Sequence, residues 1–137
     1  MADTFQLEVA TPERLLVDEQ VNEAQLPGKN GYMGVLAGHA PLLSALGAGL
    51  LSYNGGSGAH TLVIAGGFVE ISDNHVRVLA ESADLPQDIQ QDAARKDLEA
   101  ASEELKKAQT EEESDKALES MQKAQARIDG ASGKGSS

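Results

Sequence analysis

The chain contains no cysteine and no tryptophan, and it has few aromatic residues of any kind. Without cysteine there can be no disulfide, no thiol nucleophile and no thiolate metal site. Two tyrosines and two phenylalanines are too few to build a stacking platform for bases or sugars. The core of this protein must therefore be aliphatic.

Long apolar runs and excess positive charge are also missing. No apolar segment approaches the roughly 18 residues that span a bilayer, and the start, "MADTFQLEV", has neither the basic nor the apolar region of a secretory signal. The 137 residues include 11 basic and 22 acidic side chains, for a net charge of −11. This charge disfavours unaided binding to nucleic acid or to anionic lipid. Any membrane association should run through a protein partner.

The sequence offers no constellation of catalytic residues. The histidines are His39, His60 and His75, and their spacing matches no metal-binding motif. HExxH, GxSxG, Walker A and GxGxxG motifs are all absent. Paired carboxylates occur only where we expect exposed helix or loop, and there they are far more often solvated than catalytic. We therefore expect no enzyme activity, no metal and no cofactor.

Residues 1–84 have the pattern of strands separated by turns. Phe5, Leu7 and Val9 alternate with polar residues, as in a strand with one buried face. The same alternation recurs in Leu62 and Ile64, in Val69 and Ile71, and in Val76 and Val78. Gly66-Gly67 interrupts the longest of these segments. Many short strands between frequent turns predict an antiparallel β-sandwich or barrel.

Beyond residue 84 the apolar spacing changes from two to three or four. One apolar stripe comprises Ala94, Leu98, Ala101, Leu105 and Ala108, and a second comprises Ala117, Leu118, Met121, Ala124 and Ile128. We expect two amphipathic helices within 85–129, with Pro86 in the first turn and Asp84 as the cap. The acidic segment 110–114 should be the loop of an antiparallel hairpin, and 130–137 a disordered tail. The predicted fold class is thus α+β.

The two stripes are narrow and rich in alanine. Burial of a leucine contributes roughly 1.5–3 kcal/mol, and alanine contributes much less. Our hypothesis is that the hairpin is a detachable arm, weakly held against the sandwich.

The segment "LPGKNGYMGVLAGHAPLL", Leu26 to Leu43, holds four glycines, two prolines and a histidine. Such density predicts tight turns that present a defined surface. Together with "AGGFVEISDNHVRVLAESA" further along the chain, this segment resembles the ε subunit of F-type ATP synthases, known in mitochondria as δ. The most specific part is His-Ala-Pro-Leu-Leu at 39–43 combined with Gly-Gly-Phe at 66–68. The resemblance extends from about Phe5 to Ile128.

This resemblance implies a non-catalytic rotor subunit of the central stalk of a proton-translocating ATP synthase. The sandwich would bind the γ subunit and rest on the ring of c subunits, coupling their rotation to ATP synthesis. The hairpin would reach the α/β catalytic head and could inhibit ATP hydrolysis. The subunit would lie on the cytoplasmic face of the bacterial cell (inner) membrane, held there only through the c ring.

The resemblance also implies which residues meet the c ring. They are Gly28, Asn30, Gly31, Tyr32 and His39. Tyr32 stands where some relatives have an acidic residue, so it could contribute area and one hydroxyl in place of an ion pair. His39 is open to two interpretations: a hydrogen-bonding group at the docking surface, or a side chain satisfied inside the sandwich that staples the turn before Pro41.

On the second predicted helix, Lys116, Lys123 and Arg127 fall within about 40° of one another. They form either a solvated face or a cationic line, and the resemblance places their contact on acidic segments of the catalytic β subunits. Some bacterial relatives bind ATP through an Ile/Leu-Asp-x-x-Arg-Ala motif. Gln90 and Ala93 replace the acid and the arginine here, so we expect no nucleotide site.

From the residues alone, a second function is also compatible with this pattern. The chain could be a stand-alone β-sandwich binding module with a helical oligomerisation arm. Co-purification with γ and c subunits would separate the two possibilities.

Overall fold

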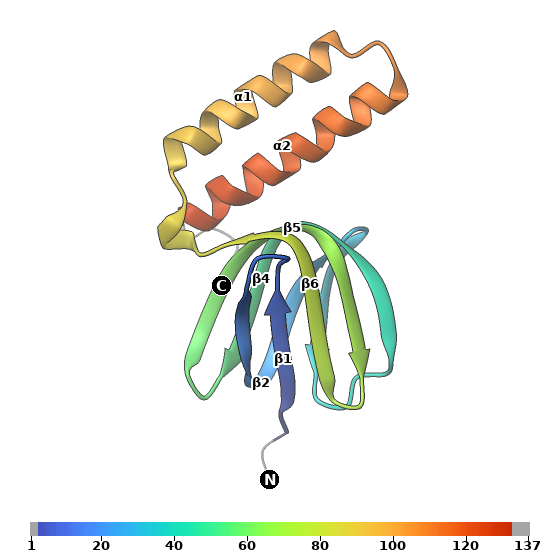
Figure 1. Ribbon diagram of the computed structural model, residues 1–137, viewed down its shortest axis with the longest axis vertical. Coiled ribbons are helices and arrows are strands. Elements are labelled where there is room, and N and C mark those ends of the chain that lie inside the picture. The colour runs from blue at the N-terminus through green and yellow to red at the C-terminus, as the bar shows by residue number, and fades with distance from the viewer. Residues whose placement is uncertain (1–2, 133–137) are drawn as a thin grey trace.

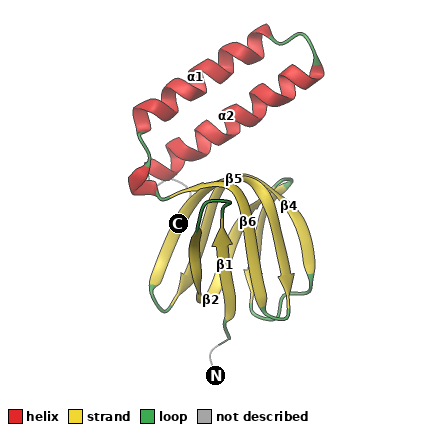
Figure 2. Cartoon of the chain, in the orientation of Figure 1, coloured by secondary structure: helices red, strands yellow, loops and turns green. Residues whose placement is uncertain are grey.

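The computed structural model describes residues 3–132, and it places a pair of helices on one end of a β-barrel (Figure 1). The strands are β1 (Phe5–Ala10), β2 (Leu15–Gly28), β3 (Gly31–Leu36), β4 (Leu42–Gly55), β5 (Gly58–Ser72) and β6 (His75–Asp84). A short 3₁₀ helix, η1 (Pro86–Asp88), leads into α1 (Gln91–Lys107) and α2 (Glu111–Ala131). The change from strands to helices after residue 84 follows the change in apolar spacing along the sequence (Figure 2).

The strands follow one another around the sheet in the order β1-β6-β5-β4-β2-β3, and β1 also pairs with β2. This second pairing closes five strands into a ring and leaves β3 at the end of the order. The predicted fold class, an antiparallel β-sandwich or barrel followed by a two-helix hairpin, is confirmed. One pair, β1 with β6, is parallel, because a closed ring of five strands cannot be antiparallel at every pair.

Three strands are longer than the short strands that the turn residues suggested. β2 and β4 have 14 residues each, and β5 has 15. Gly66 and Gly67, which we expected to interrupt a strand, instead bend β5, with φ angles of +73° and +119°. A Cβ atom at Gly67 would lie 2.1 Å from the carbonyl oxygen of Leu79. Glycine therefore lets β5 arch over the end of the barrel nearest the helices (Figure 1).

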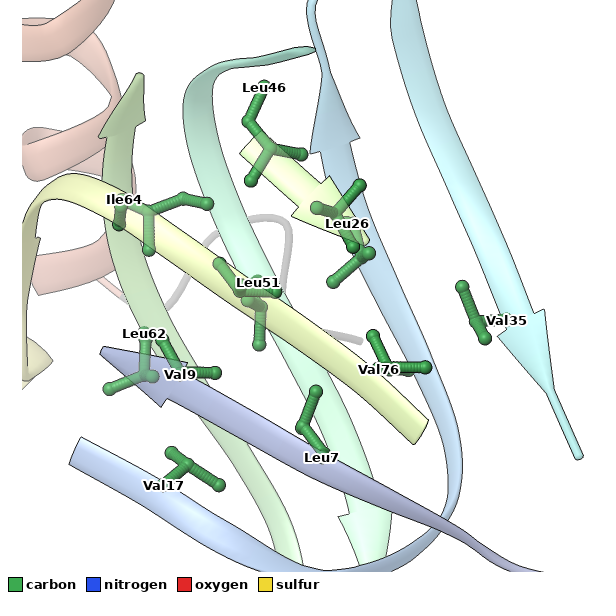
Figure 3. Packing of buried hydrophobic residues seen from close by; sticks show 14 of the residues in the cluster. Leu7, Val9, Val17, Leu26, Val35, Leu46, Leu51, Leu62, Ile64 and Val76 are labelled. Carbon is green, nitrogen blue, oxygen red and sulfur yellow. The ribbon is translucent and has the colours of Figure 1, made fainter. Parts of the chain in front are cut away.

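The barrel core is aliphatic, as the composition requires. The predicted inward residues Phe5, Leu7 and Val9 are at most 1% exposed. Figure 3 shows how side chains from different strands meet inside the barrel; those labelled include Leu26, Val35, Leu46, Leu51, Ile64 and Val76. Phe5 is the one aromatic residue among the fully buried side chains of residues 3–132. Because successive side chains of a strand point to opposite faces, the residues between these core positions lie on the outer surface.

The helical region begins later than the sequence predicted. Pro86 opens η1, and Ile89 is extended and only 9% exposed, because its side chain packs with Leu50 and Val63. α1 therefore starts at Gln91. Asp84 was expected to cap the first helix, but it ends β6 and binds Arg127.

The connection between the helices also differs from the prediction. Residues 110–114 were expected to form an acidic loop, yet only Thr110 lies outside α2. Thr110 accepts a hydrogen bond from the backbone N–H of Glu113, and the Glu113 side chain accepts one from the backbone N–H of Thr110. This capping box stabilises the first turn of α2. Acceptance of backbone N–H bonds, first from Gln109, also lowers the pKa of the Glu113 carboxyl.

The apolar stripe of α2 is shifted from the predicted one. Leu118 is 42% exposed, whereas Ala126 and Gly130 are buried. α2 continues to Ala131 because its last turns pack on the barrel, so the first two residues of the predicted tail are helical. Residues 133–137 of that tail lie outside the described part of the chain.

The hairpin contacts the barrel mainly through one helix. α1 packs against α2, and α2 packs against β4 and β5. The buried residues of α1 are two alanines, Ala94 and Ala101. The small area of these side chains means that burial stabilises α1 much less than the barrel strands.

We expect the hairpin to open independently of the barrel. In native-state hydrogen exchange on the full chain, amides of α1 should exchange at a lower free energy of opening than amides of β4 and β5, because α1 buries only alanines. Equal protection of α1 and these strands would contradict the detachable-arm hypothesis.

Candidate docking surfaces

The turn between β2 and β3 is exposed and tightly held. The backbone N–H of Lys29 donates to the carbonyl oxygen of Ala45 at 3.0 Å, which ties the turn to β4. A Cβ atom at Gly28 would lie 2.6 Å from the carbonyl oxygen of Gly31, and Gly31 has a φ of +136°. Both positions therefore need glycine. The turn, with Asn30 at its tip, is a rigid feature on the surface of the barrel.

Tyr32 braces the same turn from β3. Its hydroxyl accepts a hydrogen bond from the backbone N–H of Leu50 at 2.9 Å. Its ring lies so close to Gly49 that a Cβ atom there would be 2.6 Å from the hydroxyl oxygen. Tyr32 nevertheless remains 54% exposed. The hydroxyl is thus used within the chain, while much of the side chain stays exposed.

His39 lies at the other end of β3 from this turn. β3 has six residues, so about 17 Å of strand separates the two features. The loop of His39 is tied to the end of the barrel where the chain begins: Gly38 donates its N–H to Asn74, and Asn74 donates to the carbonyl of Thr4 (Figure 1). The structure therefore does not bring His39 together with Gly28–Tyr32, because the extended strand keeps them apart.

The side chain of His39 is neither fully exposed as a docking group nor enclosed inside the sandwich. Its Nδ1 lies 2.7 Å from the carbonyl oxygen of Ala40, which braces the turn before Pro41. The residue is half-buried rather than enclosed in the core. His39 therefore stabilises its own loop and still presents part of the ring at the surface.

A surface that the sequence analysis missed lies on the outside of the barrel. It includes one residue from each of five neighbouring strands, each paired with the next across the sheet: Ala45, Phe68, Leu79, Ala10 and Leu15. Leu43 lies two residues from Ala45 on the same face of β4. The four large side chains are between 55% and 71% exposed. We call Leu15, Leu43, Phe68 and Leu79 the apolar outer patch. The sequence could have predicted part of this surface, because strand alternation places Phe68 and Leu79 on the outward face.

Ion pairs border this patch on β1, β5 and β6. His75 and Arg77 both contact the carboxylate of Glu8, at 2.6 Å and 3.6 Å, and Arg77 also lies 3.8 Å from Glu70. The side chains of Glu8, Glu70, His75 and Arg77 are therefore in contact with one another. An apolar area with a polar border is the usual anatomy of a protein–protein interface.

The predicted cationic residues of α2 differ in their surroundings. Lys116 and Lys123 are exposed and make no ion pair within residues 3–132. Arg127 instead contacts Asp84 at 2.6 Å. Lys123 also lines a cleft of about 590 Å³ between α2 and the barrel, opposite Lys29 and Glu81.

Comparison with known proteins decides the family. A family model described as the β-sandwich domain of the ATP synthase delta/epsilon chain matches residues 4–86, which is more than half of this chain. The chain belongs to the ATP synthase delta/epsilon family. The resemblance noted in the sequence is therefore confirmed.

Relatives of this delta/epsilon chain include the hairpin as well as the barrel. The ATP synthase epsilon chain of Solibacter usitatus is 44% identical over 128 residues, covering 93% of this chain and 96% of the relative. That of Nitratidesulfovibrio vulgaris (strain DP4) is 41% identical, with the same coverage.

Solved structures share the fold of this delta/epsilon chain. A chain in the structure of the Euglena gracilis mitochondrial ATP synthase, comprising OSCP, F1 and c-ring, aligns with a TM-score of 0.78 at 24% identity, over 90% of this chain and 79% of that one. A chain of the Tetrahymena thermophila mitochondrial central stalk and c-ring aligns with a TM-score of 0.69 at 12% identity, over 92% and 95%.

Two further observations concern the described residues of this delta/epsilon chain. Neither α1 nor α2 has an apolar stretch that could cross a bilayer. No three histidine, aspartate or glutamate side chains in the range 3–132 converge as metal ligands would.

Replacement of Tyr32 by phenylalanine should lower the free energy of unfolding by about 1–2 kcal/mol, because the partly buried N–H of Leu50 loses its acceptor. The measurement is urea denaturation of the full chain. Tyr53→Phe is the matched control, since the structure gives the Tyr53 hydroxyl no hydrogen bond. Equal losses in the two variants would contradict the bracing role of Tyr32.

Proposed function

We propose that this chain is a non-catalytic rotor subunit in the central stalk of a proton-translocating F-type ATP synthase. The observation that supports this most strongly is the 44% identity to an ATP synthase epsilon chain across both barrel and hairpin. In this role the chain couples rotation of the c ring and γ to ATP synthesis through contacts, without bond-making of its own. The sequence contains none of the HExxH, GxSxG, Walker A and GxGxxG motifs.

The γ subunit is the partner for the apolar outer patch. A rotor contact has to transmit torque, so it needs a packed interface whose area excludes water. Phe68 and Leu79 are cross-strand neighbours on β5 and β6, and their partners on β4 and β1 are alanines that leave both side chains prominent. The loop of His39 leads directly into Leu43. We therefore assign His39 to the edge of this γ surface and not to the c-ring contact.

The c ring is the partner for the β2–β3 turn. Gly28, Asn30, Gly31 and Tyr32 form one continuous exposed feature, and its backbone is fixed by the bonds to Ala45 and Leu50. A rigid turn loses little conformational entropy when it docks. The polar tip at Asn30 suits hydrogen bonds to polar loops of a partner. This contact would hold the chain at the cytoplasmic face of a bacterial membrane.

The α/β catalytic head is the partner for the hairpin. The area around Lys116 and Lys123 on α2 holds two exposed cations, with Glu119 between them, in a chain whose net charge is −11. Acidic segments of a partner would be attracted to this area and repelled by most of the remaining surface. Contact there would let the hairpin resist rotation in the hydrolysis direction.

Replacing Leu79 with aspartate should weaken co-purification with γ at least about tenfold, because a charge would be buried in an apolar interface. Leu36→Asp is the matched control, since Leu36 is 62% exposed on β3 and lies outside the patch. Pull-down with co-expressed γ and c subunits measures the effect. Equal loss in both variants would argue against the patch, and failure of the parent chain to bind either partner would favour a stand-alone binding module.

Replacing both Lys116 and Lys123 by glutamine should raise ATP hydrolysis by the assembled enzyme while leaving assembly unchanged. The hairpin would then lose its attraction to acidic segments of the head. The control is the double change of Lys106 and Lys107 on α1, which removes the same charge from the same hairpin. Hydrolysis that stays at the parent level in the first variant would show that this area does not inhibit.

A further inference from the structure

One ion pair joins the hairpin to the barrel in the described chain. Nη1 of Arg127 on α2 donates to Oδ2 of Asp84 at 2.6 Å, across 43 residues of sequence. The two side chains are 25% and 32% exposed, so both are partly buried. The other ion pairs of α1 and α2 connect neighbours on one helix and are well exposed. We call the contact of Arg127 with Asp84 the hairpin–barrel ion pair.

Other acidic groups near Arg127 do not replace Asp84. Asp97 and Glu104 of α1 line the same groove of about 450 Å³ between the two helices, together with Lys123. Neither lies within ion-pair distance of Arg127. Asp84 is thus the carboxylate that holds the guanidinium, and it belongs to β6 of the barrel.

The apolar contact beside this ion pair is small. Ala126 and Gly130 of α2 meet Leu50 and Val63 of the barrel. A Cβ atom at Gly130 would lie 2.2 Å from Cγ2 of Val63, so the last turn of α2 already touches the sheet as closely as glycine permits. α1 adds little, because it packs mainly against α2. A small apolar contact gives a charge-assisted hydrogen bond a large share in holding the hairpin.

We propose that the hairpin–barrel ion pair holds the hairpin on the barrel and at the same time withholds Arg127 from any partner. Release of the hairpin and exposure of the guanidinium are then one event. A carboxylate on a partner surface competes with Asp84 for the same side chain. The contact of Arg127 with the catalytic head rests on the proposed function. The attachment of the hairpin to the barrel is a property of the chain alone.

This arrangement gives Arg127 a different role from Lys116 and Lys123. The two lysines are exposed while the hairpin is on the barrel. They can attract an acidic surface before release, and Arg127 can join them only afterwards. An acidic partner therefore gains one additional cation when the hairpin leaves the barrel, which favours the released state in its presence.

The test uses distances within the isolated full-length chain. Because the protein has no cysteine, Gln109→Cys in the helix connection and Glu13→Cys in the β1–β2 turn provide two unique sites for spin labels. The parent should show one narrow distance distribution. Asp84→Ala and Arg127→Gln should each raise the ratio of released to docked hairpin about tenfold, as expected for loss of a charge-assisted hydrogen bond.

Arg95→Gln is the matched control, because Arg95 pairs with Asp92 on the exposed surface of α1 and makes no contact with the barrel. Its distances should equal those of the parent. The charge swap Asp84→Arg with Arg127→Asp should restore the narrow distribution. Distances in Asp84→Ala and Arg127→Gln that match the control would overturn the proposal.

Hydrolysis by the assembled enzyme separates this proposal from the proposed function. Asp84→Ala frees Arg127 and should deepen inhibition, whereas the charge swap places an acid at position 127 and should relieve it. If Asp84→Ala releases the hairpin in the isolated chain and hydrolysis does not change, the hold on the barrel stands and the head contact is refuted. If the distances do not change, the ion pair does not hold the hairpin, whatever hydrolysis does.

Discussion

The bend at Gly66 and Gly67 exchanges the inward and outward positions along β5. The apolar outer patch and the surface that α2 covers both depend on this exchange. Before the bend, Leu62 and Ile64 point into the core; after it, Val69 and Ile71 do. The parity shifts by one residue, so Phe68 turns outward into the apolar outer patch. Without this shift the aromatic ring would enter the core. Positive φ angles favour glycine at both positions, and at Gly67 the backbone of β6 also leaves no room for a Cβ atom.

The same bend gives the hairpin its place. The first part of β5 passes over one end of the barrel, where Val63 faces outward between Leu50 and the last turns of α2. This segment is buried on both faces, by the core on one side and by the hairpin on the other. The second part of β5 bears Phe68, which is 58% exposed and lines the cleft between the barrel and α2. One strand thus carries both a segment that α2 covers and Phe68 of the apolar outer patch.

The contacts inside the barrel are far more extensive than those between the hairpin and the barrel. The barrel has a continuous aliphatic core, and the β2–β3 turn is fixed by Tyr32 and by the backbone of Lys29. A subunit that transmits torque needs this stiffness at its docking surfaces. The hairpin is held by alanine, glycine and a single ion pair, which suits a segment that leaves its position when a partner offers better contacts.

Local patterns in the sequence determined the fold class, the aliphatic core and the family. Strand alternation and helical spacing depend on near neighbours, so Phe5, Leu7 and Val9, or Ala94 and Ala101, could be assigned to buried faces without the structure. The capping box at Thr110 was also local, although the run of acids around it suggested a loop. The positions of Gly28 and Gly31 in a tight turn followed from residue type alone.

Only the tertiary structure decided which residues share a surface. His39 and the β2–β3 turn are near in sequence, but an extended strand carries them to opposite ends of the barrel. Phe68, Leu79 and Leu15 come from three strands and meet only through the sheet register. Arg127 reaches Asp84 only because the helices fold back onto β5. Such contacts join distant segments, and no periodicity within one segment contains them.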